Sequence, residues 1–377
     1  MPACLSAYAG VTLLPAKYGI SNIHKTLTIM DSRKTVCSLL VASLAIFAPV
    51  GGFAAKKPSR DKFTGYLFTY FEGSGGQQEH LRFAVSKDAK NWHALNGNRP
   101  VISSDSISTS GGIRDPHILR GEDGCYYIVA TDMCTKKYGW KENPGIVLLK
   151  SADLVNWTHA RIVLKTDYAE HFGDAYWVWA PQTIYDKKAK KYMIYFTLQR
   201  TGDGRKSLVT YYAYANPSFT GFESEPQVLF KAKYGSIDND IVERKGVYHL
   251  FYKGNIKNAE GKEVKNGIQQ ATSKSLKGPW KEDFKFIDAY ADTNTGVEGS
   301  GVFRLNGSDE YILMYDLYGS GRYEYQTSKD LKTFSPKTES FNKDFFPRHG
   351  TVCSITESEM KRLLQKWDTD GQCDGRH

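Results

Sequence analysis

Three carboxylate residues lie beside apolar, strand-like residues at separate points of the chain, in a pattern that suits acid–base chemistry. They are Asp115 in Ile-Arg-Asp-Pro, Asp238 in Ser-Ile-Asp and Glu298 in Val-Glu-Gly. Like charges that converge raise each other's pKa, so several buried carboxylates are costly unless they are used. A carboxyl group with a raised pKa can act as a general acid, and an ionised one as a general base. Two such groups around a sugar hydrolyse a glycosidic bond.

Two aromatic residues and a fourth acid lie in similar strand-like segments of the chain. Trp177 and Trp179 occur in Trp-Val-Trp-Ala-Pro, where strand alternation places both on one side. They either face the apolar side of a sugar ring or pack between structural units. Asp240 follows Asp238 by two residues, so alternation places it on the same face. It is therefore the alternative to Asp238 for the same role.

A repeated phrase indicates how distant carboxylates are brought together. Ser-Lys-Asp-Ala-Lys-Asn-Trp recurs as Ser-Ala-Asp-Leu-Val-Asn-Trp, and three weaker copies follow. The aromatic residues that close the copies are 65, 65, 58 and 54 residues apart. A second pattern, a turn followed by an aromatic-rich segment with strand-like alternation, also recurs once in each period. The aromatic residues that close the copies, which we expect to pack between units, are Trp92, Trp157, Phe222, Trp280 and Phe334.

Five periods of short strands favour an all-β fold, a five-bladed β-propeller. A helical solenoid is excluded because no period contains a long amphipathic stretch. The first strand of each blade lines the central channel, so polar residues at the strand starts converge. A single helix is predicted near the end, from Glu357 to Trp367, where apolar residues recur with helical spacing.

The order Arg-Asp-Pro, Trp-Ala-Pro, Ile-Asp, Glu-Gly resembles glycoside hydrolase family 43, whose members are inverting five-bladed propeller enzymes. The resemblance covers roughly residues 60–352. It implies that Asp115 is the general base, that Glu298 is the general acid, and that Asp238 orients the acid and tunes its pKa. Two departures bear on the substrate: Gln182 stands where the family often has an acid, and Ser300 where it usually has proline.

This resemblance implies hydrolysis of sugar chains. We expect an exo-acting enzyme that removes terminal α-L-arabinofuranosyl groups from plant polysaccharide or oligosaccharide. A β-D-galactosidase, an exo-β-1,3-galactanase or a β-D-xylosidase of the same fold is the alternative. A retaining, invertase-like enzyme and a non-catalytic sugar-binding propeller are the other readings. The aromatic-rich segment 166–177 is expected to wall the pocket.

His349 and Arg322 are weaker candidates for the same site. His349, in Arg-His-Gly, is a candidate for substrate binding. Members of the family that this chain resembles often hold a metal ion in the channel near such a histidine. The resemblance therefore implies either a structural calcium ion beside His349 or a histidine with a purely structural role. No cofactor is required by this chemistry. Arg322 either reaches a substrate hydroxyl or lies in a surface turn.

Residues 1–54 are expected to be a leader and secretory signal peptide, and residues 55–377 a single catalytic domain. The predicted signal has a positive start, an apolar stretch at 36–49 and small residues near 52–54. Secretion or export to a bacterial periplasm follows, and there Cys125 and Cys134 could form a disulfide. The net charge of +9 is scattered, so we expect no nucleic-acid partner. We also expect no membrane span, and a monomer.

Overall fold

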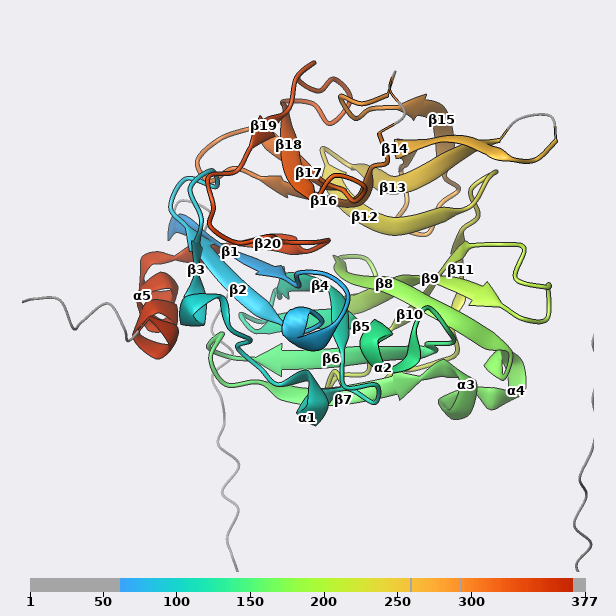
Figure 1. The fold of residues 1–377 in the computed structure, drawn as a ribbon, viewed down its shortest axis with the longest axis horizontal. Coiled ribbons are helices and arrows are strands. Elements are labelled where there is room, and N and C mark those ends of the chain that lie inside the picture. The colour runs from blue at the N-terminus through green and yellow to red at the C-terminus, as the bar shows by residue number, and fades with distance from the viewer. Residues whose placement is uncertain (1–61, 258–259, 292, 294, 369–377) are drawn as a thin grey trace, which may run out of the picture. The chain divides into compact units, whose positions relative to one another are not determined.

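Short aromatic-rich segments form twenty strands in the part of the chain that the computed structural model describes, residues 62–257, 260–291, 293 and 295–368. The predicted leader and signal lie outside these residues. The strands make five four-stranded antiparallel sheets, the blades of the predicted propeller (Figure 1). From the innermost strand outward, the first blade holds β20 (Thr351–Thr356), β1 (Phe63–Tyr70), β2 (Arg82–Ser86) and β3 (His93–Ala94).

The other four blades follow in chain order, each beginning with its inner strand. The second holds β4 (Ile113–Arg120), β5 (Tyr126–Asp132), β6 (Gly145–Ser151) and β7 (Thr158–Val163). The third holds β8 (Ala175–Asp186), β9 (Lys191–Arg200), β10 (Val209–Tyr214) and β11 (Gln227–Phe230). The fourth holds β12 (Ser236–Arg244), β13 (Val247–Lys257), β14 (Glu263–Ser273) and β15 (Lys281–Phe286). The fifth holds β16 (Glu298–Arg304), β17 (Tyr311–Leu317), β18 (Arg322–Ser328) and β19 (Glu339–Ser340).

The first blade is completed by the two ends of the folded chain. Strand β20 pairs antiparallel with β1, and Thr351 lies opposite Thr69 in the register. In Figure 1 the red β20 lies beside the blue β1. This pairing joins the last inner strand to the first blade and covers an edge that would otherwise stay open. The prediction of a five-bladed β-propeller is therefore confirmed.

The repeated phrase forms the turn between the third and fourth strands of a blade. In the first copy the Asp88 carboxylate accepts a hydrogen bond of 2.8 Å from the amide of Asn91. The second copy repeats the bond at 2.8 Å between Asp153 and Asn156. Trp92 closes its turn by donating from Nε1 to the carbonyl of the residue three positions before it. The phrase recurs because each blade needs this turn, and a polar side chain, an aspartate in three of the five copies, accepts from the turn's backbone amides.

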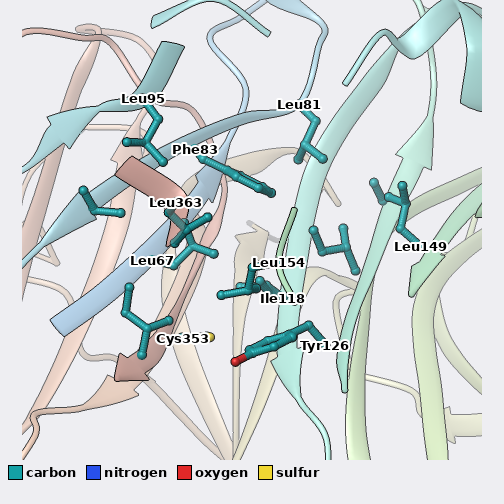
Figure 2. Close-up of a cluster of buried hydrophobic side chains, with 14 of the residues drawn as sticks. Leu67, Leu81, Phe83, Leu95, Ile118, Tyr126, Leu149, Leu154, Cys353 and Leu363 are labelled. Atoms are coloured by element: carbon teal, nitrogen blue, oxygen red, sulfur yellow. The ribbon is translucent and has the colours of Figure 1, made fainter. Parts of the chain in front are cut away.

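Apolar side chains pack between neighbouring blades and fix their angle. Figure 2 shows the cluster between the first and second blades, which includes Leu67, Phe83, Ile118 and Leu149. The predicted helix forms as α5 (Glu357–Trp367), and it begins with a capping box at Thr356. Its Leu363 is fully buried in the same cluster. Burying each such side chain contributes about 1.5–3 kcal/mol to stability. The helix therefore stabilises the first blade, in which β20 pairs with β1.

Within the described residues, six shorter helices lie in the connections between strands. They are the single-turn helices η2 (Gly76–Gln78), η3 (Leu95–Asn98), α1 (Ser104–Ile107), α2 (Thr135–Tyr138), α3 (Leu164–Asp167) and α4 (Ala169–Phe172). Among the helices of the described residues, none is long and apolar enough to cross a membrane.

Cys125 and Cys134 are free thiols, so the possible disulfide between them is not formed. Cys125 precedes β5 and Cys134 follows it. A strand advances about 3.3 Å per residue, so the length of β5 holds the two sulfur atoms far apart. Cys353 lies in β20.

Candidate active site

Residues from the sheets of four blades, and from the connections next to β1 and β20 of the first blade, line a cavity of about 230 Å³. The lining includes the three predicted acids Asp115, Asp238 and Glu298, together with Trp179 and His349. Two other hollows in the described part, of about 180 and 880 Å³, contain none of these five residues. The structure therefore brings five of the seven predicted site residues to one place.

The inner strands of four blades share one irregularity that aims side chains at this cavity. In each of them a β-bulge sets two inner-strand residues against one residue of the next strand. The first residue of each bulge has left-handed backbone: Asp115 (φ 52°), Ala180 (φ 45°), Asp238 (φ 54°) and Gly299 (φ 66°). Asp115 and Asp238 thus occupy equivalent positions. Glu298 stands one residue before its bulge, so it does not share the position of the two aspartates.

Asp115 is held by hydrogen-bonding and charged neighbours. The hydroxyl of Thr131 donates a 2.9 Å hydrogen bond to Oδ2, and Nδ1 of His349 lies 3.6 Å from Oδ1. Burial alone would raise the pKa of Asp115, but His349, the charge of Arg114 and Thr131 together hold that pKa below its usual range. The carboxyl group is therefore ionised at neutral pH, as a general base must be.

His349 lies between two of the acids. Its Nδ1 is 3.6 Å from Oδ1 of Asp115 and 3.6 Å from Oδ1 of Asp238. Burial would lower the pKa of His349, but the charges of Asp238 and Asp115 raise it to about 9. An imidazolium ion at this point neutralises part of the negative charge that the converging acids bring to the cavity.

A calcium ion at this nitrogen does not fit the residues present. Calcium takes six to eight oxygen ligands, whereas Nδ1 of His349 is a nitrogen that already faces two carboxylates at ion-pair distances. In the described part of the chain, no group of three or more His, Cys, Asp or Glu side chains is arranged to hold a metal ion. A calcium ion elsewhere in the channel stays a prediction.

Asp238 and Asp240 have different surroundings. The amide of Gly299 donates a 2.9 Å hydrogen bond to Oδ2 of Asp238. Burial, with the charges of Glu298 and Asp115, raises the pKa of Asp238 to about 6. Asp240 instead accepts a 2.6 Å hydrogen bond from the amide of Val302, and it is not among the residues that line the cavity. The bulge interrupts strand alternation between the two residues, so the expectation that Asp240 shares the face of Asp238 is wrong.

Glu298 is flanked by two cations. Nζ of Lys253 lies 3.4 Å from Oε2, and Nη2 of Arg348 lies 3.4 Å from Oε1. Arg348 also donates from Nε to the buried carboxyl of Asp316. Burial raises the pKa of Asp316 to about 7 in spite of Arg348. The side chain of Glu298 is thus held from both sides while it lines the cavity.

The residues after Glu298 explain one departure from the family pattern. A Cβ atom on Gly299 would lie 2.9 Å from Cβ of His349, so only glycine fits there. The hydroxyl of Ser300 donates a 2.9 Å hydrogen bond to the carbonyl of Asp238, a bond that proline could not make. Gln182 is buried and accepts a hydrogen bond of 3.0 Å from the hydroxyl of Tyr195.

The two predicted tryptophans stack on each other. The rings of Trp177 and Trp179 are 4.0 Å apart and nearly parallel, which confirms that both lie on one side. Trp179 lines the cavity and is fixed by a 2.8 Å hydrogen bond from Nε1 to Asn143. Trp177 donates to the carbonyl of Lys141 and is not among the lining residues. Trp140, 56% exposed, meets Trp179 edge-on and extends the aromatic wall.

The structure does not bring Arg322 to this cavity. Its guanidinium group pairs with Glu324 at 3.0 Å, and its side chain is half exposed. The segment 166–177, expected to wall the pocket, is used elsewhere: Phe172 is buried in the core and His171 pairs with Glu225 at 2.7 Å. The aromatic wall comes from Trp140 and Trp179 instead.

Sequence reasoning missed several residues that line the cavity. They are Phe71, Arg114, Met133, Trp140, Ile237, Lys253, Asp316 and Arg348. Arg114 and Arg348 each precede a predicted site residue in the sequence, and this adjacency could have identified them as site residues. Lys253 and Asp316 lie on second strands, opposite Ile237 and Glu298. Only the strand register identifies these two residues.

Comparison with known proteins places the chain in a family. The model of a family described as a probable glycosyl hydrolase domain, related to glycoside hydrolase family 43, matches residues 61–361. An α-L-arabinofuranosidase from Bifidobacterium longum subsp. longum is 26% identical over 81% of this chain. The chain spans about a third of that relative's length, 34%.

Solved structures share the fold at low sequence identity. An endo-1,4-β-xylanase from Bacteroides thetaiotaomicron superposes with a TM-score of 0.52 at 18% identity, over 76% of this chain and 93% of its own. A β-1,3-galactosidase of family 43 gives 0.52 at 14% identity, over 70% and 54%. A family 43 protein from Bacillus licheniformis gives 0.51 at 15% identity, over 78% and 57%. Because the family model covers well over half of the sequence, this chain belongs to the family of probable glycosyl hydrolase domains related to glycoside hydrolase family 43.

Proposed function

We propose that this protein is an inverting, exo-acting glycoside hydrolase that removes terminal sugars, with α-L-arabinofuranosyl groups as its first candidate substrate. The observation that carries the proposal is the meeting of Asp115, Asp238 and Glu298, from three blades, in one cavity. A cavity of about 230 Å³ suits a chain end better than an internal chain segment. In this assignment Asp115 is the base, Glu298 the acid and Asp238 the residue that orients the acid.

The proposed reaction is a single displacement at the anomeric carbon. Asp115 accepts a proton from a water molecule as the water oxygen bonds to that carbon. The glycosidic bond breaks on the opposite face, and Glu298 donates a proton to the departing oxygen. In an inverting enzyme the two carboxyl groups stand about 6.5–9.5 Å apart, which leaves room for the water. The lowered pKa of Asp115 supports its assignment as the base.

The substrate assignment rests on the α-L-arabinofuranosidase relative. A β-D-galactoside or a β-D-xyloside is the second candidate substrate. Trp179 offers an aromatic surface of the kind that packs on a sugar ring. We further propose that the protein works as a secreted or periplasmic monomer, to be checked by fractionation of the cells and by light scattering.

The experiment is hydrolysis of a panel of nitrophenyl glycosides, followed by arabinan digestion. We expect release from the α-L-arabinofuranoside with the opposite anomer formed first, as seen by proton NMR. Retention of configuration would favour the invertase-like mechanism instead. Oligosaccharides released from arabinan without monosaccharide would refute exo action. Sugar binding without hydrolysis of any glycoside would favour a non-catalytic propeller.

A further inference from the structure

Thr131 holds the predicted base from a neighbouring strand. It lies on β5 directly opposite Arg114, at the edge of the bulge that contains Asp115, and it is fully buried. Its hydroxyl donates a 2.9 Å hydrogen bond to Oδ2 of Asp115. The same oxygen accepts a 2.8 Å hydrogen bond from the amide of Ala180, in the equivalent bulge of the next blade. One hydroxyl thus joins the bulges of two blades.

The donor and acceptor roles in this chain of hydrogen bonds are fixed. A backbone amide can only donate, so the bond from Ala180 must end on a lone pair of the Thr131 oxygen. The hydroxyl has one proton, and Asp115 is the acceptor placed to receive it. Oδ2 accepts this bond, while Oδ1 is the oxygen that lies 3.6 Å from His349. The carboxylate is thus held at both oxygens, and each keeps a further lone pair to take a proton from water.

The equivalent residues in the other blades differ in type and partner, and one of them, Lys253, also contacts an acid of the site, Glu298. The residues at the same register position on the second strands are Thr197, Lys253 and Asp316. Thr197 donates to the carbonyl of Ser236 and accepts from the side chain of Asn239. The position generally links neighbouring blades, and in the second blade the residue that makes the link, Thr131, also bonds the predicted base.

We propose that Thr131 is a positioning residue for the hydrolysis, which holds the carboxylate of Asp115 in the orientation that receives the proton of the attacking water. This inference rests on the proposed function, because it assigns a role within that reaction. Thr131 keeps its own proton throughout and does not touch the substrate. The energy of its bond to an ionised carboxylate corresponds to about a 10- to 100-fold effect on rate.

The test compares Thr131→Val with Thr131→Ser on an activated aryl glycoside. Valine keeps the shape and removes the hydroxyl, so kcat is expected to fall about 10- to 100-fold while KM changes less than about threefold. Serine should restore kcat to within a few fold of the wild type. Thr210→Val is the control: Thr210 is equally buried, on β10, and its hydroxyl bonds Ser236 at 3.1 Å. The control should keep its kcat.

A double-mutant cycle separates positioning from a merely structural role. In the Asp115→Asn background, adding Thr131→Val should cost little further activity, because the group that it positions is already lost. Equal losses in both backgrounds, or wild-type kcat in Thr131→Val, would overturn the inference. If Asp115→Asn itself keeps full activity, or the wild type hydrolyses nothing, the proposed function fails instead.

Discussion

The amide of Gly299 donates a 2.9 Å hydrogen bond to Oδ2 of Asp238, so the residue after the predicted acid holds the predicted orienting group. Ser300 adds a second contact to the carbonyl of Asp238. Gly299 also packs against His349, which lies 3.6 Å from both Asp115 and Asp238. Movement of one bulge would therefore disturb three predicted catalytic groups together.

We expect Gly299→Ala to lose stability and most activity. Its φ of 66° is unfavourable for alanine, and the new Cβ would lie 2.9 Å from Cβ of His349. The unfolding free energy should fall by about 2–4 kcal/mol in urea denaturation. Gly307→Ala is the control: it has a φ of 65° but no atom within 4 Å of the added Cβ, so it should lose only about 1–2 kcal/mol and keep its activity.

Asp115→Asn and Glu298→Gln should each lower kcat about 10²- to 10⁴-fold, since each removes a proton-transfer group while keeping the side-chain shape. The two variants should differ in leaving-group dependence. Glu298→Gln should be partly spared with dinitrophenyl glycosides, whose departing oxygen needs little protonation. Steady-state kinetics across a series of aryl leaving groups measures this. A uniform loss in Glu298→Gln would contradict its role as the acid.

Arg348→Ala and Arg322→Ala should behave differently. Arg348 contacts Glu298 and the buried Asp316, so its loss leaves Glu298 with Lys253 alone and Asp316 unpaired. We expect kcat/KM to drop at least about 10²-fold and stability to fall on the order of 2 kcal/mol. Arg322 is half exposed and pairs with Glu324, so its replacement should change kcat/KM less than about threefold. A large loss in Arg322→Ala would restore its predicted role at the substrate.

Asp240 should make stability depend on pH. Burial raises its pKa from 3.8 to about 7, in spite of its bond from the Val302 amide. A carboxyl group with a raised pKa favours the folded state fully below pH 4, and this contribution is lost as pH rises through 7. Asp240→Asn should remove that decline, on the order of 4 kcal/mol at most. Urea denaturation of both proteins between pH 4 and 8 measures it, and parallel curves would refute it.

Much of this protein follows from local sequence alone. The turn phrase recurs because each blade needs this turn, whose amides are satisfied by an aspartate such as Asp88 or Asp153 or by another polar side chain such as Asn216, so counting its copies gives the number of blades. The final helix was predictable to the residue, because its apolar spacing and its cap are both local signals. The acids at the starts of the inner strands were also predictable, because the short motifs that contain them are local signals.

The tertiary structure alone decided how these residues meet. The β-bulges shift alternation, so Asp240 leaves the face of Asp238 and Glu298 sits one residue before its bulge. A bulge depends on the register between two strands, which no local pattern specifies. Lys253, Asp316 and Thr131 reach the acids only through that register and the packing of neighbouring blades. Their roles depend on contacts between residues far apart in the chain, and folding is what creates those contacts.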